Sequence, residues 1–227
     1  MPEKVIINEI FTSIQGEGPY VGIKQLFIRF SRCNLNCSYC DTDFRNKEKA
    51  TEYNVNTLIA KMNEMDVESC HSIVLTGGEP LLEIEFLKQF LPRLNDKKIY
   101  LETNGILYQN LEQIINYISF ISMDYKLSSA TGYTSKHDIH KRFLHIAKEN
   151  NKDVFLKVVF DSNITDLEIK QVCELAEKYQ VQICLQPVMK DSKVAEGIDI
   201  NAVMDKFIKH YQNVRLIPQV HTFLGLQ

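Results

Sequence analysis

The sequence Cys33-Asn34-Leu35-Asn36-Cys37-Ser38-Tyr39-Cys40 places three cysteines close together, directly after an apolar run typical of a buried strand. Thiolates at this spacing can bind only a compact soft-metal centre, and iron–sulfur clusters and zinc are the usual ones. A closed site of either kind normally has four ligands, but no fourth cysteine follows nearby. The motif therefore predicts a cluster in which one iron is open to a ligand that the protein does not supply.

Strand-like and helix-like patterns alternate on both sides of this motif. Apolar runs typical of strands occupy residues 5–11, 26–30, 72–75, 99–101, 118–122, 154–160, 181–185 and 214–217. Helical patterns occupy residues 55–65, 86–94, 135–150, 165–179 and 200–211, and Thr165 with Glu168 predicts a capping box. Nearly all-apolar strands that alternate with helices predict an α/β fold with a mainly parallel sheet. The strand count favours an incomplete, open parallel β/α barrel, with the strand at residues 5–11 added at an edge.

Polar segments follow several of these strands. Thr76-Gly77-Gly78-Glu79-Pro80 follows one strand, Glu102-Thr103-Asn104-Gly105 another, Asp124-Tyr125-Lys126 a third and Gln186-Pro187 a fourth. In parallel α/β folds, ligands bind at the carboxyl ends of the strands. Gly77 and Gly78 would let a ligand approach the backbone, although an ordinary tight turn explains them equally well. The sequence thus predicts one site that collects these segments and the cysteine loop.

Composition limits the classes of protein that the chain can belong to. Its 227 residues, 44% of them hydrophobic, suit a single domain over residues 1–227, and the net charge of −3 does not indicate binding to nucleic acid or to anionic membranes. We find neither a signal peptide nor a long apolar run, so we expect a cytoplasmic protein with reduced thiols. The six cysteines then do not indicate three disulfides. Cys173 and Cys184 fit buried apolar positions, and Cys70 stays unassigned.

The cysteine motif and the Gly-Gly-Glu-Pro segment resemble two motifs of the radical S-adenosylmethionine (SAM) superfamily. The resemblance implies a [4Fe–4S] cluster on Cys33, Cys37 and Cys40, with SAM chelating the fourth iron. It also implies an open barrel of the radical SAM type, and an electron from the reduced cluster that cleaves SAM to a 5′-deoxyadenosyl radical. The cofactors would then supply the difficult chemistry while the protein positions them.

Further segments are similar to the 7-carboxy-7-deazaguanine synthase family. They are Ser13-Ile14-Gln15-Gly16-Glu17-Gly18, Phe27-Ile28-Arg29-Phe30, Cys40-Asp41-Thr42, the three later polar segments, and Pro218-Gln219-Val220-His221. This resemblance implies a carbon–nitrogen lyase that converts 6-carboxy-5,6,7,8-tetrahydropterin to 7-carboxy-7-deazaguanine and ammonia, on the route to queuosine and other 7-deazapurines. SAM would be regenerated in each turnover. The family also implies Mg²⁺, a homodimer, and flavodoxin or ferredoxin as electron donor.

The resemblance assigns roles to individual residues. Substrate would be bound by Ile14, Gln15, Gly16, Glu17, Arg29, Thr103, Gln219 and His221. SAM would be bound by Tyr39, Asp41, Gly77, Gly78, Glu79, Gly105, Asp124, Tyr125, Lys126 and Gln186, and Mg²⁺ by Thr42. The amide of Gln15 offers a donor and an acceptor, and Arg29 can bind a carboxylate with two parallel hydrogen bonds. Asp124-Tyr125-Lys126 departs from the Ser-Pro-Lys of many relatives, and no side chain is an obvious general base.

Several alternatives remain open at this point. Arg29 also fits a solvated position on a surface strand, and Thr42 also fits a helix N-cap. Within the superfamily, a glycyl-radical-enzyme activase is the nearest alternative function, although Gln15-Gly16-Glu17-Gly18 and Arg29 favour a small acidic heterocycle as substrate. In another class, a non-catalytic metal-binding or electron-carrying module could hold zinc on the three cysteines with Asp41 or His71.

Overall fold

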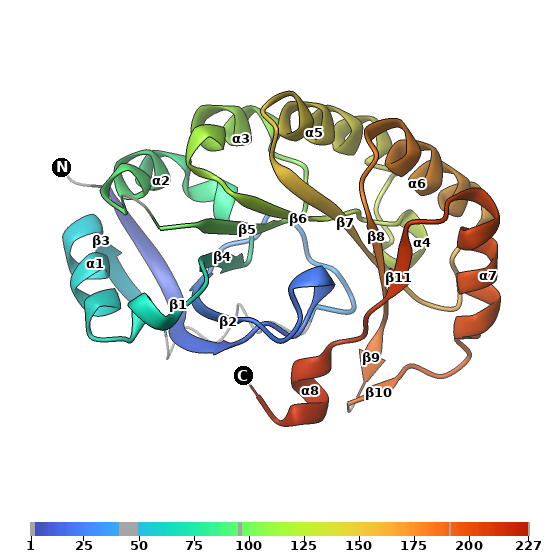
Figure 1. The fold of residues 1–227 in the computed structure, drawn as a ribbon, viewed down its shortest axis with the longest axis horizontal. Coiled ribbons are helices and arrows are strands. Elements are labelled where there is room, and N and C mark those ends of the chain that lie inside the picture. Colours follow the sequence, from blue (N-terminus) through green and yellow to red (C-terminus); the bar gives the residue numbers. More distant parts are fainter. Residues whose placement is uncertain (1–2, 41–49, 95–96, 191, 227) are drawn as a thin grey trace.

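A nine-stranded sheet forms the centre of the protein, and it does not close on itself. In the computed structural model, which describes residues 3–40, 50–94, 97–190 and 192–226, the strand order is β11-β8-β7-β6-β5-β4-β2-β1-β3. The run from β11 to β2 is parallel, whereas β1 and β3 are antiparallel to their neighbours. Figure 1 shows the sheet as an arc with β3 and β11 at its ends. The predicted open, mainly parallel barrel is therefore confirmed.

The strands largely follow the predicted apolar runs. The sheet consists of β1 (Lys4–Ile14), β2 (Lys24–Phe30), β3 (Thr51–Asn54), β4 (Ile73–Gly77), β5 (Ile99–Thr103), β6 (Phe120–Asp124), β7 (Asp153–Phe160), β8 (Ile183–Pro187) and β11 (Val214–Leu216), and β9 (Met189–Lys190) with β10 (Lys193–Val194) forms a separate hairpin. The predicted edge position of the first strand is wrong, because β3 pairs with the outer side of β1. The short, polar and largely exposed sequence of β3 carries no apolar pattern that could reveal it.

Helices cover the convex side of the arc (Figure 1). They are α1 (Val55–Asn63), α2 (Ile84–Phe90), α3 (Tyr108–Ile114), α5 (His137–Glu149), α6 (Asp166–Tyr179) and α7 (Ile200–His210). The chain also forms the short helices α4 (Ser128–Thr131) and α8 (Val220–Leu224), and 3₁₀ turns at Gly18–Tyr20, Val67–Ser69, Pro80–Glu83, Leu91–Arg93 and Ile115–Tyr117. The predicted capping box of α6 is confirmed, since the Thr165 side chain accepts from Glu168 N and Glu168 bonds back to Thr165 N. The short helices α3, α4 and α8 were not predicted from the sequence.

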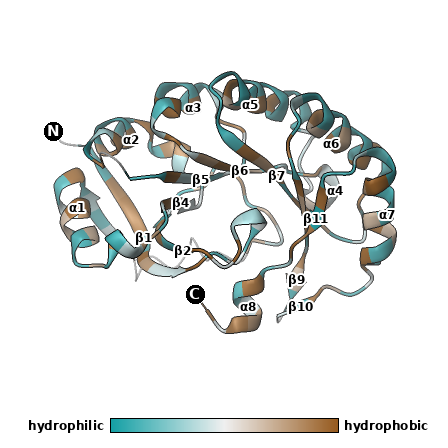
Figure 2. Ribbon diagram, viewed as in Figure 1, coloured by the Kyte–Doolittle hydropathy of each residue, from teal (hydrophilic) through white to brown (hydrophobic). Residues whose placement is uncertain are grey.

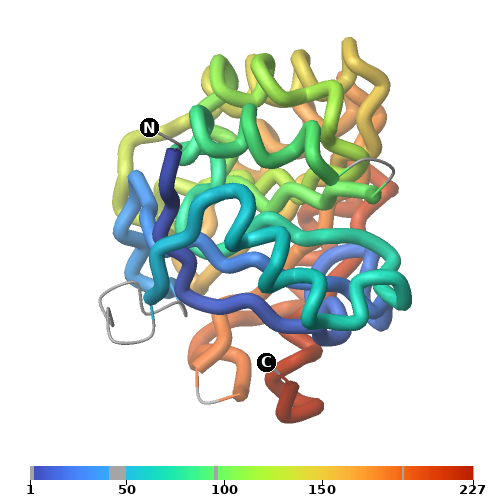
Figure 3. The backbone as a smooth tube through the Cα atoms, turned by 90° about the vertical axis from the view of Figure 1, so that its left-hand side faces the viewer, coloured from blue at the N-terminus to red at the C-terminus, as the bar shows by residue number. Residues whose placement is uncertain are grey.

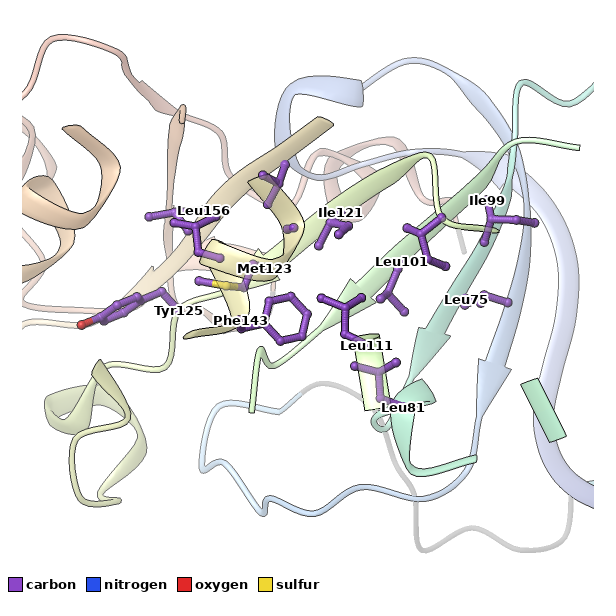
Figure 4. Packing of buried hydrophobic residues seen from close by; sticks show 14 of the residues in the cluster. Leu75, Leu81, Ile99, Leu101, Leu111, Ile121, Met123, Tyr125, Phe143 and Leu156 are labelled. Atoms are coloured by element: carbon purple, nitrogen blue, oxygen red, sulfur yellow. The ribbon is translucent and has the colours of Figure 1, made fainter. Parts of the chain in front are cut away.

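The sheet buries apolar side chains on both faces, as near-continuous apolar strands require. Figure 4 shows Leu101, Ile121 and Met123 from the strands packed with Leu111 and Phe143 from the helices. A smaller cluster lies on the concave face and consists of Phe27, Val74, Tyr100, Phe155 and Cys184. Figure 2 shows the resulting pattern, with brown strands inside helices whose outward faces are teal. Concave-face residues beyond this cluster, toward the carboxyl ends of the strands, are therefore available to bind ligands.

The cysteines outside the motif behave largely as predicted. Cys173 and Cys184 are buried, with exposures of 2% and 1%. Cys70 is half-buried at the amino end of β4, where its Sγ donates to Asp66 O at 3.4 Å. Separately, no helix among the described residues has both the length and the apolar composition needed to cross a membrane.

The C-terminal segment returns to the concave side. Figures 1 and 3 both show α8 beside the β9–β10 hairpin, on the far side of the molecule from the N-terminus. Val220 N donates to Gly16 O at 2.9 Å, which fixes α8 to the loop after β1. A Cβ built on Gly16 would lie 2.3 Å from His221 Nδ1, so this contact requires glycine. The loop after β1 and the C-terminal helix α8 therefore meet at one place.

Candidate active site

A cavity of about 220 Å³ lies at the carboxyl ends of the parallel strands. Its wall contains most of the residues predicted from the sequence: Ile14, Gln15, Gly16, Glu17, Arg29, Cys33, Cys37, Tyr39, Cys40, Gly77, Gly78, Thr103, Asp124, Lys126, Gln186, Gln219 and His221. These residues come from both ends of the chain and from six strands or the loops after them. The predicted convergence on one site is confirmed, although the individual binding roles stay predictions. Asp41 and Thr42 lie outside the described residues.

The cysteine loop follows β2 and is tied to the end of β5. Asn104 Nδ2 donates to Asn34 Oδ1 at 2.7 Å, and Asn104 O bonds His140 Nε2 at 3.0 Å. On the other side, Asn36 N donates to the Tyr133 hydroxyl at 2.8 Å. These contacts turn Cys33, Cys37 and Cys40 toward the cavity. The sequence analysis assigned no role to Asn104, because its loop partner lies 70 positions away in the chain.

The zinc alternative with His71 is wrong. His71 N donates to Lys24 O at the amino end of β2, and its ring lies 6.0 Å from Tyr20 and 5.3 Å from Phe120. The cysteines follow the opposite end of β2. Within the part of the chain that the structure describes, no three His, Cys, Asp or Glu side chains form a group suited to a single metal ion.

The two glycines after β4 are required by the packing of the cysteine loop. A Cβ on Gly78 would lie 1.8 Å from Arg32 O, and a Cβ on Gly77, at φ 106°, would lie 2.4 Å from Phe30 O. Two backbone bonds join the same segments, from Gly78 N to Phe30 O at 2.9 Å and from Glu79 N to Arg32 O at 2.7 Å. Gly77 and Gly78 therefore fix the position of the first cysteine as well as forming part of the cavity wall.

We expect Gly78→Ala to displace the cysteine loop, because a backbone oxygen cannot rotate away from the new methyl group. The free energy of unfolding should fall by about 1–3 kcal/mol, and the iron content after anaerobic reconstitution should fall with it. Gly132→Ala is the control for backbone strain alone: its methyl group meets no atom within 4 Å, so any loss of stability comes from the positive φ of 74°, and we expect normal iron content. Normal iron content in Gly78→Ala would show that the loop tolerates the displacement.

Three predicted SAM contacts lie outside the cavity wall. The carboxylate of Glu79 is buried and accepts from Thr103 Oγ1 at 2.9 Å, Asn104 N at 2.8 Å and Leu81 N at 3.1 Å. Burial raises its pKa to about 7. Gly105, at φ 69°, packs against Met123 and His140. The Tyr125 side chain points into the helical layer (Figure 4), where its hydroxyl bonds His137 Nδ1 at 2.8 Å. Only backbone atoms of Gly105 and Tyr125 remain candidates for ligand contacts.

A chain of alternating charges crosses the cavity wall. Lys157 Nζ lies 2.8 Å from Glu17 Oε2 and 3.6 Å from Asp124 Oδ2, and Lys126 Nζ lies 2.8 Å from the same Asp124 oxygen. Lys126 also donates to the Tyr39 hydroxyl at 3.1 Å. Burial opposes the charge on Lys126, but Asp124 and Tyr39 outweigh it and raise the pKa. The sequence analysis missed Lys157, since it sits in an otherwise apolar strand.

Glu17 connects the loop after β1 to the C-terminal segment. It accepts from Gln219 Nε2 at 3.0 Å and from Gln186 Nε2 at 3.3 Å, in addition to its ion pair with Lys157. Burial alone would raise its pKa, but Lys157, Gln219 and His221 lower it to about 2. Glu17 is therefore ionised at neutral pH and holds four segments of the chain together.

The amide of Gln15 is used within the protein. Its Nε2 donates to Gln25 Oε1 and to Glu102 Oε1, both at 3.0 Å, and its Oε1 accepts from Glu17 N at 3.0 Å. Both amide hydrogens are used by acceptors of the protein, and the role of Gln15 in binding substrate stays a prediction. Gln15 positions the loop and the carboxylate of Glu102, which also lines the cavity and was not predicted.

Arg29 does not match the solvated-surface alternative. Its Nε donates to Glu9 Oε2 at 2.9 Å, and its guanidinium lies 5.6 Å from the centre of the Phe11 ring. The side chain is 24% exposed and forms part of the cavity wall. Arg29 therefore places a positive charge in the cavity wall, and this charge attracts an anionic ligand.

Two buried acceptors in the wall need donors from a ligand. Asp124 Oδ1 and Gln186 Oε1 have no hydrogen-bond partner among the described residues, and both residues line the cavity. A buried acceptor without a partner costs about 1–3 kcal/mol. Ribose hydroxyls or an amino group, as SAM carries them, would satisfy both. Together with three convergent thiols, these acceptors fit an iron–sulfur cluster with a bound nucleotide.

Comparisons with known proteins agree with this geometry. The Radical SAM superfamily profile matches residues 27–176. The 7-carboxy-7-deazaguanine synthase of Geobacter sulfurreducens is 33% identical over 96% of this chain and 96% of its own, and that of Archaeoglobus fulgidus is 30% identical over 96% and 97%. The crystal structure of QueE from Escherichia coli superposes with a TM-score of 0.63 at 20% identity, covering 96% of this chain and 95% of that one. At that identity the structural likeness shows the fold alone.

Proposed function

We propose that the chain is the lyase that forms 7-carboxy-7-deazaguanine in the biosynthesis of queuosine and other 7-deazapurines. The chain belongs to the 7-carboxy-7-deazaguanine synthase family of the radical SAM superfamily. Its substrate is 6-carboxy-5,6,7,8-tetrahydropterin, and ammonia is released. The observation that supports this best is a single cavity with three thiols in one wall and Arg29 in another. The activase alternative is less favoured, because the relatives named above match over nearly their whole length.

Cys33, Cys37 and Cys40 would hold a [4Fe–4S] cluster, and the open iron would bind SAM. When bound and reduced, this pair of cofactors supplies the 5′-deoxyadenosyl radical. Asp124 and Gln186 would accept hydrogen bonds from SAM through their unpartnered oxygens. Lys126, fixed by Asp124 and Tyr39, places a buried ammonium beside the cysteine loop, where it attracts a carboxylate.

The remaining wall would position the pterin. Arg29 places its guanidinium in the cavity wall, where it would bind the substrate carboxylate. Glu17, Gln219 and His221 join the loop after β1 to the C-terminal segment and exclude water from this side of the cavity. A cavity closed in this way protects radical intermediates from side reactions.

Anaerobic turnover tests the proposal directly. Reconstituted, dithionite-reduced protein is incubated with SAM and 6-carboxytetrahydropterin, and the product is identified by mass spectrometry. We expect 7-carboxy-7-deazaguanine to form only when both SAM and reductant are present. A protein that carries cluster and SAM but forms no deazaguanine would overturn the proposed function.

Magnesium is the third proposed cofactor, with the hydroxyl of Thr42 as its protein ligand. Mg²⁺ keeps several waters and accepts few protein oxygens, so one hydroxyl together with the substrate carboxylate is a reasonable set. We expect EDTA to lower the turnover rate and added Mg²⁺ to restore it. In Thr42→Val, the rate should no longer respond to Mg²⁺. A rate that is unaffected by EDTA would rule the metal out.

We further propose a homodimer in solution and a flavodoxin or ferredoxin as the one-electron donor. Both proposals rest on family resemblance. Light scattering on the purified protein tests the first, and product formation with each reduced carrier in place of dithionite tests the second.

A further inference from the structure

Glu102 has a capacity for ligand binding that the proposed function does not use. It lies near the carboxyl end of β5 and lines the cavity. Its two oxygens each accept one bond, from Gln15 Nε2 at 3.0 Å and from Thr76 Oγ1 at 2.5 Å. An ionised carboxylate has about four acceptor positions, so about two remain. Both hydrogen-bond partners are neutral, and no ion pair with Glu102 is formed among the described residues, although Lys157 attracts its carboxylate at longer range.

The other cavity acids are already paired. Glu17 and Asp124, which also line the cavity, each form ion pairs with lysines. Gln15 and Thr76 hold the Glu102 carboxylate in place without neutralising it. A fixed acceptor of this kind selects ligands that present two adjacent N–H groups, because two parallel bonds to one carboxylate are both strong and directional.

The strand register places Glu102 opposite Arg29. Arg29 pairs with Thr76 across β2 and β4, and Leu75 pairs with Leu101 across β4 and β5, so Arg29, Thr76 and Glu102 form one row. Residues in such a row point to the same face, as the bond from Thr76 to Glu102 confirms. Arg29 and Glu102 are two strand spacings apart, which is about 9.6 Å between backbones. This row therefore offers a cation at one end and an acceptor at the other, at a distance that suits a bicyclic ring.

We propose that Glu102 selects the 2-amino-4-oxopyrimidine edge of the substrate. Its carboxylate accepts hydrogen bonds from the exocyclic 2-amino group and from the adjacent ring N–H, while Arg29 binds the carboxylate at the other end of the pterin. The inference rests on the proposed function and adds to it the residue that distinguishes a pterin from a 2,4-dioxopteridine. In the dioxopteridine, a carbonyl oxygen replaces the 2-amino group and faces the carboxylate. Both groups are hydrogen-bond acceptors, so no bond can form between them.

The test compares two probes by isothermal titration calorimetry on anaerobic, cluster-loaded protein with SAM. The probes are 6-carboxypterin and 6-carboxylumazine, which differ by the amino group or oxygen at C2. We expect the wild-type protein to bind 6-carboxypterin about 100-fold more tightly, because a site built to accept from an N–H rejects an analogue that lacks it.

Glu102→Gln is the matched variant. Its amide oxygen can accept from Gln15 and one amide N–H can donate to Thr76, so the wall stays intact, and the second N–H can donate to the C2 carbonyl of lumazine. We expect weaker binding of 6-carboxypterin and a preference that falls below about 10-fold or inverts. The control is Glu68→Gln, because Glu68 is exposed at the amino end of the sheet and should leave the wild-type preference unchanged.

The outcomes separate this inference from the proposed function. If the wild-type protein binds both probes equally, or if folded Glu102→Gln keeps the full preference, the role of Glu102 is overturned while turnover can still support the function. If cluster-loaded wild-type protein binds neither probe, the proposed function and the inference fall together. If Glu102→Gln fails to fold, the wild-type comparison still tests the inference, because equal binding of the two probes would overturn the role of Glu102.

Discussion

Cys37→Ala is expected to abolish turnover and to remove the visible absorption of the reconstituted protein. Only three cysteines face the cavity, so the variant retains two protein ligands for a cluster that needs three. Without the cluster, no radical forms and the rate falls toward the uncatalysed one, which for enzymes is typically lower by roughly 10⁶-fold or more. Product formation, iron content and the visible spectrum are measured on the same anaerobic preparation.

Cys70→Ala is the matched control for this prediction. Cys70 is half-buried like Cys37, but it lies at the amino end of β4, at the opposite edge of the sheet from the cavity. We expect normal iron content and normal turnover in this variant. Should Cys37→Ala keep a visible cluster and turn over substrate, or should Cys70→Ala lose both, the assignment of the three motif cysteines would be wrong.

The sequence predicted the fold well wherever both faces of a strand are buried. The strands from β4 to β8 appear as apolar runs because helices cover one face and the concave cluster covers the other. Strand β3 is covered less, since two of its four residues are exposed and only Tyr53 packs against the core. Its short polar sequence therefore shows no apolar pattern. The edge of the sheet is therefore where prediction from periodicity was wrong.

Within the site, the residues that could be predicted from the sequence are those that belong to short motifs. The three cysteines and the two glycines stand in short motifs, and their spacing alone restricts what they can do. Lys157 belongs to no short motif. It is a single charged residue within the largely apolar strand Asp153–Phe160, and its partner Glu17 lies 140 positions away in the chain. Glu102 and Gln15 were in quoted segments, but their bond to each other spans 87 positions. Only the sheet register brings such pairs together.

Lys157→Met is expected to lower the free energy of unfolding by about 3–5 kcal/mol, the usual cost of removing one partner from a buried ion pair. The side chains of Glu17 and Asp124 are only 17% and 13% exposed, so water cannot replace the lost ammonium. Lys206→Met is the control, because its pair with Asp166 has side chains 49% and 81% exposed, and an exposed ion pair contributes little to stability. Urea unfolding of the reconstituted proteins, followed by circular dichroism, measures both.

The pH dependence identifies the cause of that loss. In the wild-type protein the pKa of Glu17 is lowered from 4.5 to about 2, so its contribution is fully present above pH 4.5 and is lost as the pH falls toward 2. In Lys157→Met, the lysine charge no longer opposes the effect of burial, so the pKa of Glu17 should be higher than in the wild-type protein. As the pH falls, Glu17 should therefore become protonated in the variant at a higher pH, and this protonation removes the cost of an unpaired buried charge. The difference in stability between the two proteins should therefore narrow as the pH falls from 7 to 5.

Adding Glu17→Gln to Lys157→Met should recover part of the lost stability at pH 7, since a neutral amide needs no counterion. If the loss of stability in Lys157→Met changes neither with pH nor with the added Glu17→Gln substitution, Lys157 acts through packing alone.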